Sequence, residues 1–211
     1  MAKLASASSG SEVPIAECPG QVGPRNRVKT VLLIVLLGFA PGLAYPDARE
    51  GENKAQLCLL CHKPNNPMAY LPTLEGQTRE YLYSQIKAYQ EKRRPDNIMQ
   101  TNAASLSDAD IRDIAEYFAS QRPIRASFKL DLQKVALGRS KARDLECGTC
   151  HRPDFSGEKK TPRLAGLDPR YGGRQIVDFV LGKRPHPYVK GMSEISSEEA
   201  ECLAQFFAHL E

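Results

Sequence analysis

The chain has 211 residues, of which 41% are hydrophobic and 26% are charged, a composition that is typical of a folded protein and not of a disordered one. The mean hydropathy is −0.43 and there is a single short apolar run, which argues against a polytopic membrane protein. The net charge of +4 is too small to predict nucleic-acid binding.

The apolar run covers residues 31–40 and has the features of an export signal. Three basic residues precede it, and the small residues Gly42 and Ala44 follow it where a signal peptidase would cleave. We therefore expect residues 1–44 to be a leader that directs the chain to the periplasm. A retained anchor that keeps the protein membrane-associated is the alternative, but the run is short for a membrane span and Pro41 interrupts its end.

Residues 58–62 and 147–151 each have the pattern C-x-x-C-H, the attachment signature of a c-type haem. Two thiols three residues apart can form thioethers with the two vinyl groups of one porphyrin, and the adjacent histidine can then bind the iron. A zinc site of four thiolates is the alternative, but it would leave both histidines without a role. The candidate residues are Cys58, Cys61, Cys147 and Cys150 for covalent attachment of two haem c groups, and His62 and His151 as iron ligands.

The sequence that follows each motif is repeated as well. Residues 72–76 match residues 162–166, both with the pattern P-x-L-x-G. Further matches at the same spacing join Tyr81, Gln85, Ile86 and Pro95 to Tyr171, Gln175, Ile176 and Pro185. A duplicated haem domain explains these matches, so we expect an all-α protein of two tandem cytochrome c-like domains, at 46–122 and 123–211, each around one covalently bound haem.

Each copy should contain three helices that position its haem. We expect them near 47–61, 80–91 and after Ser107 in the first copy, and near 134–150, 173–181 and after Ser196 in the second. Ser107 and Ser196 are each followed three residues later by an acidic side chain, which predicts a capping box at the start of the last helix.

The second axial ligand of each iron must come from another part of the chain. Met99 and Met192 each precede the last helix of their copy, so we predict them as these ligands. Met68 is too close to His62 in the sequence to reach around the porphyrin.

The two predicted methionine loops differ in length. Met99 lies eight residues before Ser107, whereas Met192 lies only four residues before Ser196. His186, in the segment Arg-Pro-His-Pro-Tyr, is therefore the alternative ligand in the second copy.

Two sets of residues are candidates for supporting the haems. The backbone carbonyls of Pro72 and Pro162 could accept the remaining N–H of each histidine ligand, or these prolines could simply form turns. The basic residues Arg93, Arg94, Lys183 and Arg184 could neutralise haem propionates, or they could form a solvated basic surface.

These residues together resemble the cytochrome c4 family of di-haem class I cytochromes c. The similarity covers about residues 46–211 and rests on both C-x-x-C-H motifs, both P-x-L-x-G turns and the segment L-S-D-x-D-I at 106–111. The resemblance implies two cytochrome c folds, histidine and methionine ligation at both irons, and delivery of electrons to a terminal oxidase.

We therefore expect a di-haem c-type cytochrome that is not an enzyme and that shuttles electrons in the periplasm between respiratory donors and a terminal oxidase. The expected partners are redox proteins: a terminal oxidase, a quinol–cytochrome c reductase or a dehydrogenase. One alternative is the cytochrome subunit of a flavocytochrome or alcohol dehydrogenase complex. Another is a catalytic di-haem enzyme, such as a peroxidase or thiosulfate dehydrogenase, which would need an open position on one iron.

Overall fold

The structure, a computed structural model, describes residues 46–64, 71–124, 128–187 and 189–210. All of them belong to one compact unit, Leu43–Glu211. The predicted leader and Met68 lie outside the described residues. In the part that is described, the chain is helical with one isolated β-bridge, and none of its helices is long and apolar enough to cross a membrane.

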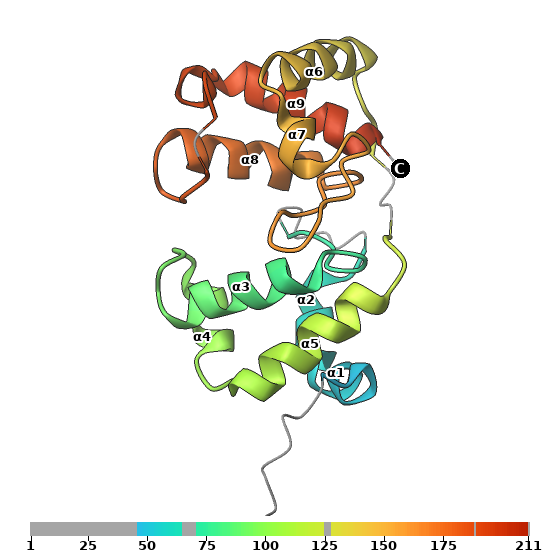
Figure 1. The fold of residues 1–211 in the computed structure, drawn as a ribbon, viewed down its shortest axis with the longest axis vertical. Coiled ribbons are helices and arrows are strands. Elements are labelled where there is room, and N and C mark those ends of the chain that lie inside the picture. The colour runs from blue at the N-terminus through green and yellow to red at the C-terminus, as the bar shows by residue number, and fades with distance from the viewer. Residues whose placement is uncertain (1–45, 65–70, 125–127, 188, 211) are drawn as a thin grey trace, which may run out of the picture. The chain divides into compact units, whose positions relative to one another are not determined.

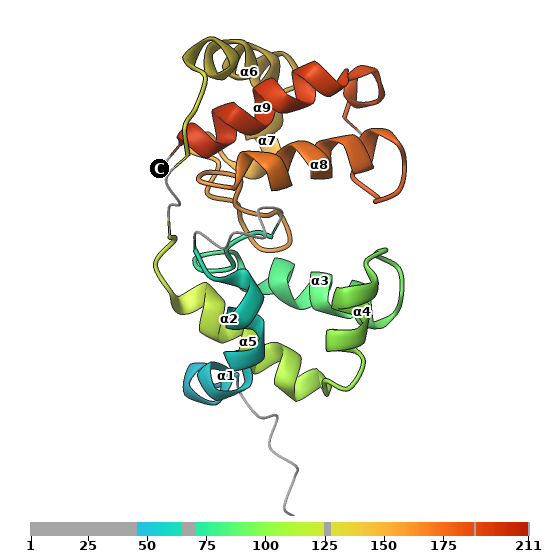
Figure 2. The same ribbon diagram turned by 180° about the vertical axis from the view of Figure 1, so that it is seen from behind.

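The helices form two groups that pack internally (Figures 1 and 2). The first group contains α1 (Ala48–Lys54), α2 (Gln56–His62), α3 (Arg79–Gln90), α4 (Asn97–Ala103) and α5 (Asp108–Ser120). The second contains α6 (Leu132–Asp144), α7 (Cys147–His151), α8 (Pro169–Val180), the 3₁₀ turn η1 (Met192–Glu194) and α9 (Ser197–His209). The all-α prediction is confirmed, while the exact domain limits, 46–122 and 123–211, stay a prediction.

The last helix of each copy organises its group. In the first copy α5 packs against α1 and α3, and in the second α9 packs against α6 and α8. Both predicted capping boxes are present: the Ser107 and Ser196 side chains accept the N–H groups of Asp110 and Glu199, whose carboxylates accept in return. The capped helices therefore begin where the sequence predicts.

Two features of the helices differ from the prediction. The first predicted helix of each copy is divided in two, at Ala55 in the first copy and at residues 145–146 in the second. The helix α4 was not expected, and among the described residues of its counterpart in the second copy only the short turn η1 is helical. The copies thus differ in the segment where the second axial ligand is sought.

The core of each copy is small and apolar. In the first copy Ala55, Leu82, Ile114, Ala115 and Phe118 form one buried cluster. In the second copy a larger cluster is centred on α9, with Leu203, Phe206 and Phe207 against Val135 and Phe155. A copy of about 80 residues has a limited core, so an apolar cofactor would add buried surface that each copy needs.

Glycine allows the first and last helices of each copy to cross closely. A Cβ built on Gly51 would lie 2.0 Å from the carbonyl oxygen of Asp113, and one on Gly138 would lie 1.9 Å from that of Cys202. These are backbone atoms that cannot rotate away, so a side chain at either position would force the two helices apart.

The crossing predicts that Gly138→Ala destabilises the protein. Because the new methyl group meets backbone, the free energy of unfolding should fall by about 1–3 kcal/mol, despite the better helix propensity of alanine. Chemical denaturation of the holo-protein measures this. The matched control is Gly173→Ala in α8, where the nearest atom to a built Cβ is 3.7 Å away. Equal stability of the two variants would contradict the close crossing.

Candidate haem sites

The two C-x-x-C-H motifs lie on the short helices α2 and α7. Their histidines are buried, with His62 7% exposed and His151 8% exposed. Cys58, Cys61 and Cys147 are partly buried, and Cys150 is exposed. On one short helix, two thiols and an imidazole are thus held within about one and a half turns.

Each of these histidines is oriented by one hydrogen bond to a proline carbonyl. His62 Nδ1 lies 2.8 Å from the oxygen of Pro72, and His151 Nδ1 lies 2.9 Å from the oxygen of Pro162. A carbonyl oxygen can only accept, so Nδ1 carries the proton and donates it, and Nε2 keeps a free lone pair. Of the two alternatives for these prolines, the structure shows the one in which their carbonyls accept the histidine N–H.

The same two imidazoles are held in the neutral form that a metal requires. Burial lowers the pKa of His62 and of His151 below the usual value, and the hydrogen bond to the proline carbonyl offsets only part of this. Both rings are therefore neutral near pH 7. A neutral imidazole with a bare Nε2 fits an iron ligand.

The thiols do not behave as a thiolate cluster. Burial raises the pKa of Cys58, and it raises the pKa of Cys147 to about 11. Within the described ranges no group of three or more His, Cys, Asp or Glu side chains is gathered to hold a metal ion. The zinc alternative finds no support, while two separate pairs of thiols fit covalent attachment of two haems.

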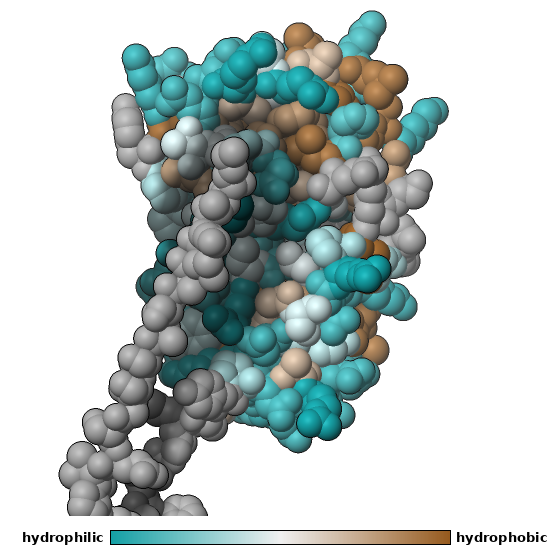
Figure 3. Space-filling model, turned by 45° about the vertical axis from the view of Figure 1, so that its right-hand side comes forward, coloured by the Kyte–Doolittle hydropathy of each residue, from teal (hydrophilic) through white to brown (hydrophobic). Residues whose placement is uncertain are grey.

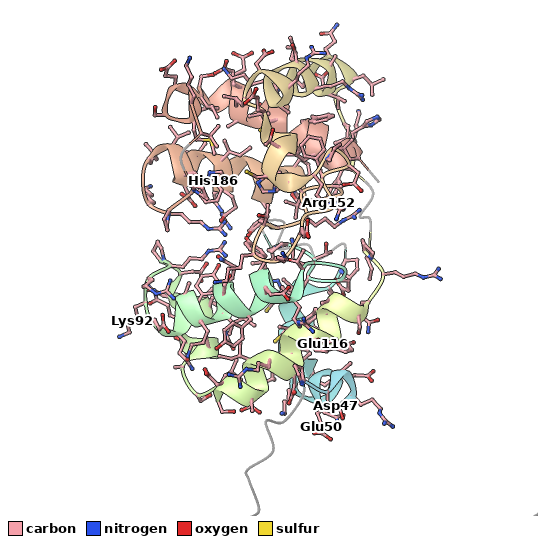
Figure 4. All side chains as sticks on the ribbon, viewed as in Figure 1. Asp47, Glu50, Lys92, Glu116, Arg152 and His186 are labelled. Carbon is pink, nitrogen blue, oxygen red and sulfur yellow. The ribbon has the colours of Figure 1, made fainter. Side chains whose placement is uncertain are left out.

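The candidates for the second axial position have different surroundings. Met99 is partly buried near the start of α4, and its N–H donates to the side chain of Asp96 over 3.0 Å. Met192 begins η1 and packs against the apolar cluster of the second copy. His186 follows α8, where Figure 4 labels it, and its ring centroid lies 6.3 Å from that of His151.

Six polar side chains join α3 and α8 through hydrogen bonds. Arg94 donates to its own copy's Gln85 and to Tyr171 and Gln175 of the other copy, over 2.7–3.0 Å. Arg184 donates in the same way to Gln175, Tyr81 and Gln85, over 2.6–2.8 Å. All three pairs, Arg94 and Arg184, Tyr81 and Tyr171, Gln85 and Gln175, are repeat partners. We call these six residues the arginine–tyrosine network.

The network contains two buried positive charges. Arg94 and Arg184 are each 8% exposed, and in the described part of the chain neither forms an ion pair with a carboxylate. Buried charges are normally paired, and a haem brings its own carboxylates, so the two guanidinium groups fit that cofactor. The tyrosines and glutamines were visible in the sequence only as repeat matches, without a role.

Comparisons with known proteins place the chain among di-haem cytochromes. It is 34% identical over 176 residues to cytochrome c4 of Azotobacter vinelandii, which covers 73% of this chain and 82% of the relative. It is 35% identical over 203 residues to the thiosulfate dehydrogenase electron acceptor of Stutzerimonas stutzeri, covering 89% and 94%. The fold is similar to the crystal structure of reduced cytochrome c4 from Pseudomonas stutzeri, with a TM-score of 0.71 and 27% identity over 79% of this chain and all of that one. No family model matches the chain.

The shared acceptors of the network predict that its two arginines are energetically coupled. Arg94→Met and Arg184→Met should each lower the free energy of unfolding of the holo-protein by about 1–3 kcal/mol, because each change leaves a buried tyrosine hydroxyl without its donor. Denaturation of both single variants and the double variant completes a mutant cycle. Lys183→Met, at an exposed neighbour, is the control. Strictly additive losses, or a loss as small as that of the control, would contradict the network.

Proposed function

This chain belongs to the cytochrome c4 family of di-haem c-type cytochromes, and we propose that it carries electrons in the periplasm between respiratory donors and a terminal oxidase. The observation that supports this most directly is the repeated site: each copy places a buried, neutral histidine with a free Nε2 beside two thiols. Two equivalent sites in one compact unit suit a carrier that holds two electrons.

We assign the residues of both sites as follows. The thiols of Cys58 and Cys61 attach one haem and those of Cys147 and Cys150 attach the other, with His62 and His151 as the first axial ligands. Met99 is the second axial ligand in the first copy, and Met192 is that of the second. When bound, each haem supplies a one-electron ferric–ferrous couple. The protein's own contribution is to fix the ligands, exclude water through its apolar clusters and balance the cofactor's charge with Arg94 and Arg184.

This assignment describes a carrier and not a catalyst. An enzyme that transforms a small molecule at iron needs an exchangeable ligand position, whereas a side chain on each face of the haem leaves none. We propose that electrons enter and leave at haem edges near the protein surface, when a redox partner docks.

The surface beside the first motif suits such brief docking. Leu57 and Leu60 lie on α2 next to the cysteines and are 73% and 67% exposed. Figure 3 shows one face of the molecule, on which most residues are hydrophilic and the hydrophobic ones gather mainly in the upper part of the view. Small exposed apolar patches with polar rims are a common form of protein-interaction site. We propose that a terminal oxidase or a quinol–cytochrome c reductase contacts this surface.

A second candidate function is to accept electrons from a dehydrogenase. The similarity to a thiosulfate dehydrogenase electron acceptor, which this chain matches over 94% of that protein's length, favours it. In that role the same two sites would still carry electrons, and only the donor would differ.

Electron exchange with defined partners tests the proposal. The ascorbate-reduced holo-protein should be reoxidised by membranes that contain a terminal oxidase, and cyanide should block this. Leu60→Lys should slow the second-order step several-fold, because it places a charge in the docking surface, whereas Leu137→Lys on α6, 61% exposed in the native chain, should not.

The alternatives give other results in the same assay. Rapid reduction by a thiosulfate dehydrogenase with thiosulfate, without oxidation by membranes, would favour the dehydrogenase-acceptor role. Turnover of peroxide or thiosulfate by the purified protein alone would contradict a pure carrier.

A further inference from the structure

We propose that Gln77, a side chain of the first copy, tunes the haem ligand His151 of the second copy through one shared peptide group. This peptide joins Pro162 to Arg163, and it is hydrogen-bonded to His151 at one end and to Gln77 at the other. The inference rests on the proposed function, because it requires a haem in the second copy. It makes Gln77 a positioning residue for a site in the copy to which it does not belong.

The Pro162–Arg163 peptide is engaged at both of its polar atoms. Its carbonyl oxygen accepts the Nδ1–H of His151 over 2.9 Å, which is the bond that orients this ligand. Its N–H, which belongs to Arg163, donates to Oε1 of Gln77 over 2.7 Å. Imidazole, peptide and glutamine side chain therefore form a continuous chain of two hydrogen bonds, which starts at the ligand of one copy and ends in the other copy.

The side chain of Gln77 is fixed in the orientation that this chain of bonds requires. Its Nε2 donates to the carbonyl of Arg163 over 3.0 Å, while its Oε1 accepts the Arg163 N–H. A flipped amide would place donor against donor and acceptor against acceptor, so the hydrogen bonds determine which atom is which. Oε1 also accepts the N–H of Thr78 over 2.9 Å, and Gln77 is only 9% exposed. A buried amide with these three bonds has little freedom to turn away from the peptide.

Gly157 closes one face of the same peptide. A Cβ built on this glycine would lie 2.4 Å from both the Pro162 carbonyl carbon and the Arg163 nitrogen. The N–H of Gly157 also donates to the carbonyl oxygen of His151 over 3.1 Å. Backbone packed this closely leaves no space for a water molecule against that face of the peptide.

The repeat partner of Gln77 cannot do the same for the first copy. Residues 72–77 are PTLEGQ and residues 162–167 are PRLAGL, so the partner of Gln77 is Leu167. An aliphatic side chain neither donates nor accepts, and Leu167 therefore cannot extend the equivalent hydrogen bond of the first copy. The influence runs in one direction, from the first copy to the second.

The chain of bonds acts on the reduction potential through the basicity of the ligand. A hydrogen bond at the N–H of a peptide polarises its carbonyl, which then accepts more strongly. A stronger acceptor at Nδ1 makes His151 a more basic ligand, which favours the ferric over the ferrous state. Gln77 therefore lowers the potential of the second haem relative to the value that it has without this bond.

The effect is mutual by thermodynamic linkage. When the second haem is ferric, the Nδ1–H of His151 is a stronger donor, and both hydrogen bonds of the chain gain strength. The contact between Gln77 and Arg163 is therefore tighter in the ferric protein than in the ferrous protein.

A redox titration that resolves the two haems tests this inference. The haem methyl NMR signals, assigned to each copy by their contacts with α2 or α7, give the two potentials separately. Gln77→Met removes both bonds to Arg163 at nearly the same side-chain volume. The potential of the second haem should rise, so that its ferrous-to-ferric ratio at the wild-type midpoint increases roughly two- to four-fold, while the first haem keeps its potential.

Thr78→Val is the matched control. It removes the neighbouring hydrogen bond between the copies, from Thr78 Oγ1 to the carbonyl of Lys159 over 2.6 Å, and leaves the Pro162–Arg163 peptide untouched. Both potentials should stay at their wild-type values in this variant.

The outcomes separate the inference from the proposed function. An unchanged second potential in Gln77→Met, an equal shift at both haems, or the same shift in Thr78→Val would overturn the inference and leave the carrier function intact. If the wild type holds fewer than two redox-active haems, the proposed function fails and the inference fails with it.

Amide exchange in the wild type decides the question if Gln77→Met does not fold. The Arg163 N–H should exchange slowly with deuterated water, and more slowly in the ferric than in the ferrous protein. Exchange at the rate of an exposed amide, or at equal rates in the two states, would rule out the proposed chain of bonds.

Discussion

The hydrogen bond between a buried imidazole and a proline carbonyl is the constraint on which both sites depend. It occurs in each copy, from His62 to Pro72 and from His151 to Pro162. It fixes the proton on Nδ1 and leaves Nε2 with a free lone pair, as an iron ligand requires. Without it, a C-x-x-C-H helix would still carry thiols, but its imidazole could rotate or change tautomer.

The two copies are joined by the arginine–tyrosine network, which stabilises the protein only if all of its buried polar groups are hydrogen-bonded. The two buried guanidinium groups share one glutamine acceptor from each copy, and each also donates to one tyrosine of the other copy. In the described residues no carboxylate is paired with them. In a buried environment each hydrogen bond is strong, and each polar group left without a partner lowers the free energy of unfolding. Cofactor carboxylates would complete the charge balance, so haem binding and the association of the two copies should support each other.

Duplication gives two similar sites, but the sequence between Pro95 or Pro185 and the last helix has diverged. Asp96 starts a helix in one copy, and His186 stands at the same position in the other. The two copies thus differ in local fold in this segment, with α4 in the first copy and the short turn η1 in the second.

Much of this organisation could be predicted from the sequence, because local chemistry dictates it. The motif spacing fixes the attachment residues, and the Ser107 and Ser196 capping boxes fix where the last helices begin. The helix α4 was missed although Asp96 is a local N-cap signal for it. The break at Ala55 could not be predicted, because no capping side chain marks it. The contact between His186 and His151 joins residues 35 positions apart, and only the fold reveals it.

The central claim is that each copy carries one covalently attached haem, and mass spectrometry of the mature protein tests it most directly. The intact mass should exceed that of the polypeptide by two haems. After proteolysis, one haem should remain on the peptide with Cys58 and Cys61, and one on the peptide with Cys147 and Cys150. A mature chain with a single haem, or with either pair of thiols free, would contradict the account.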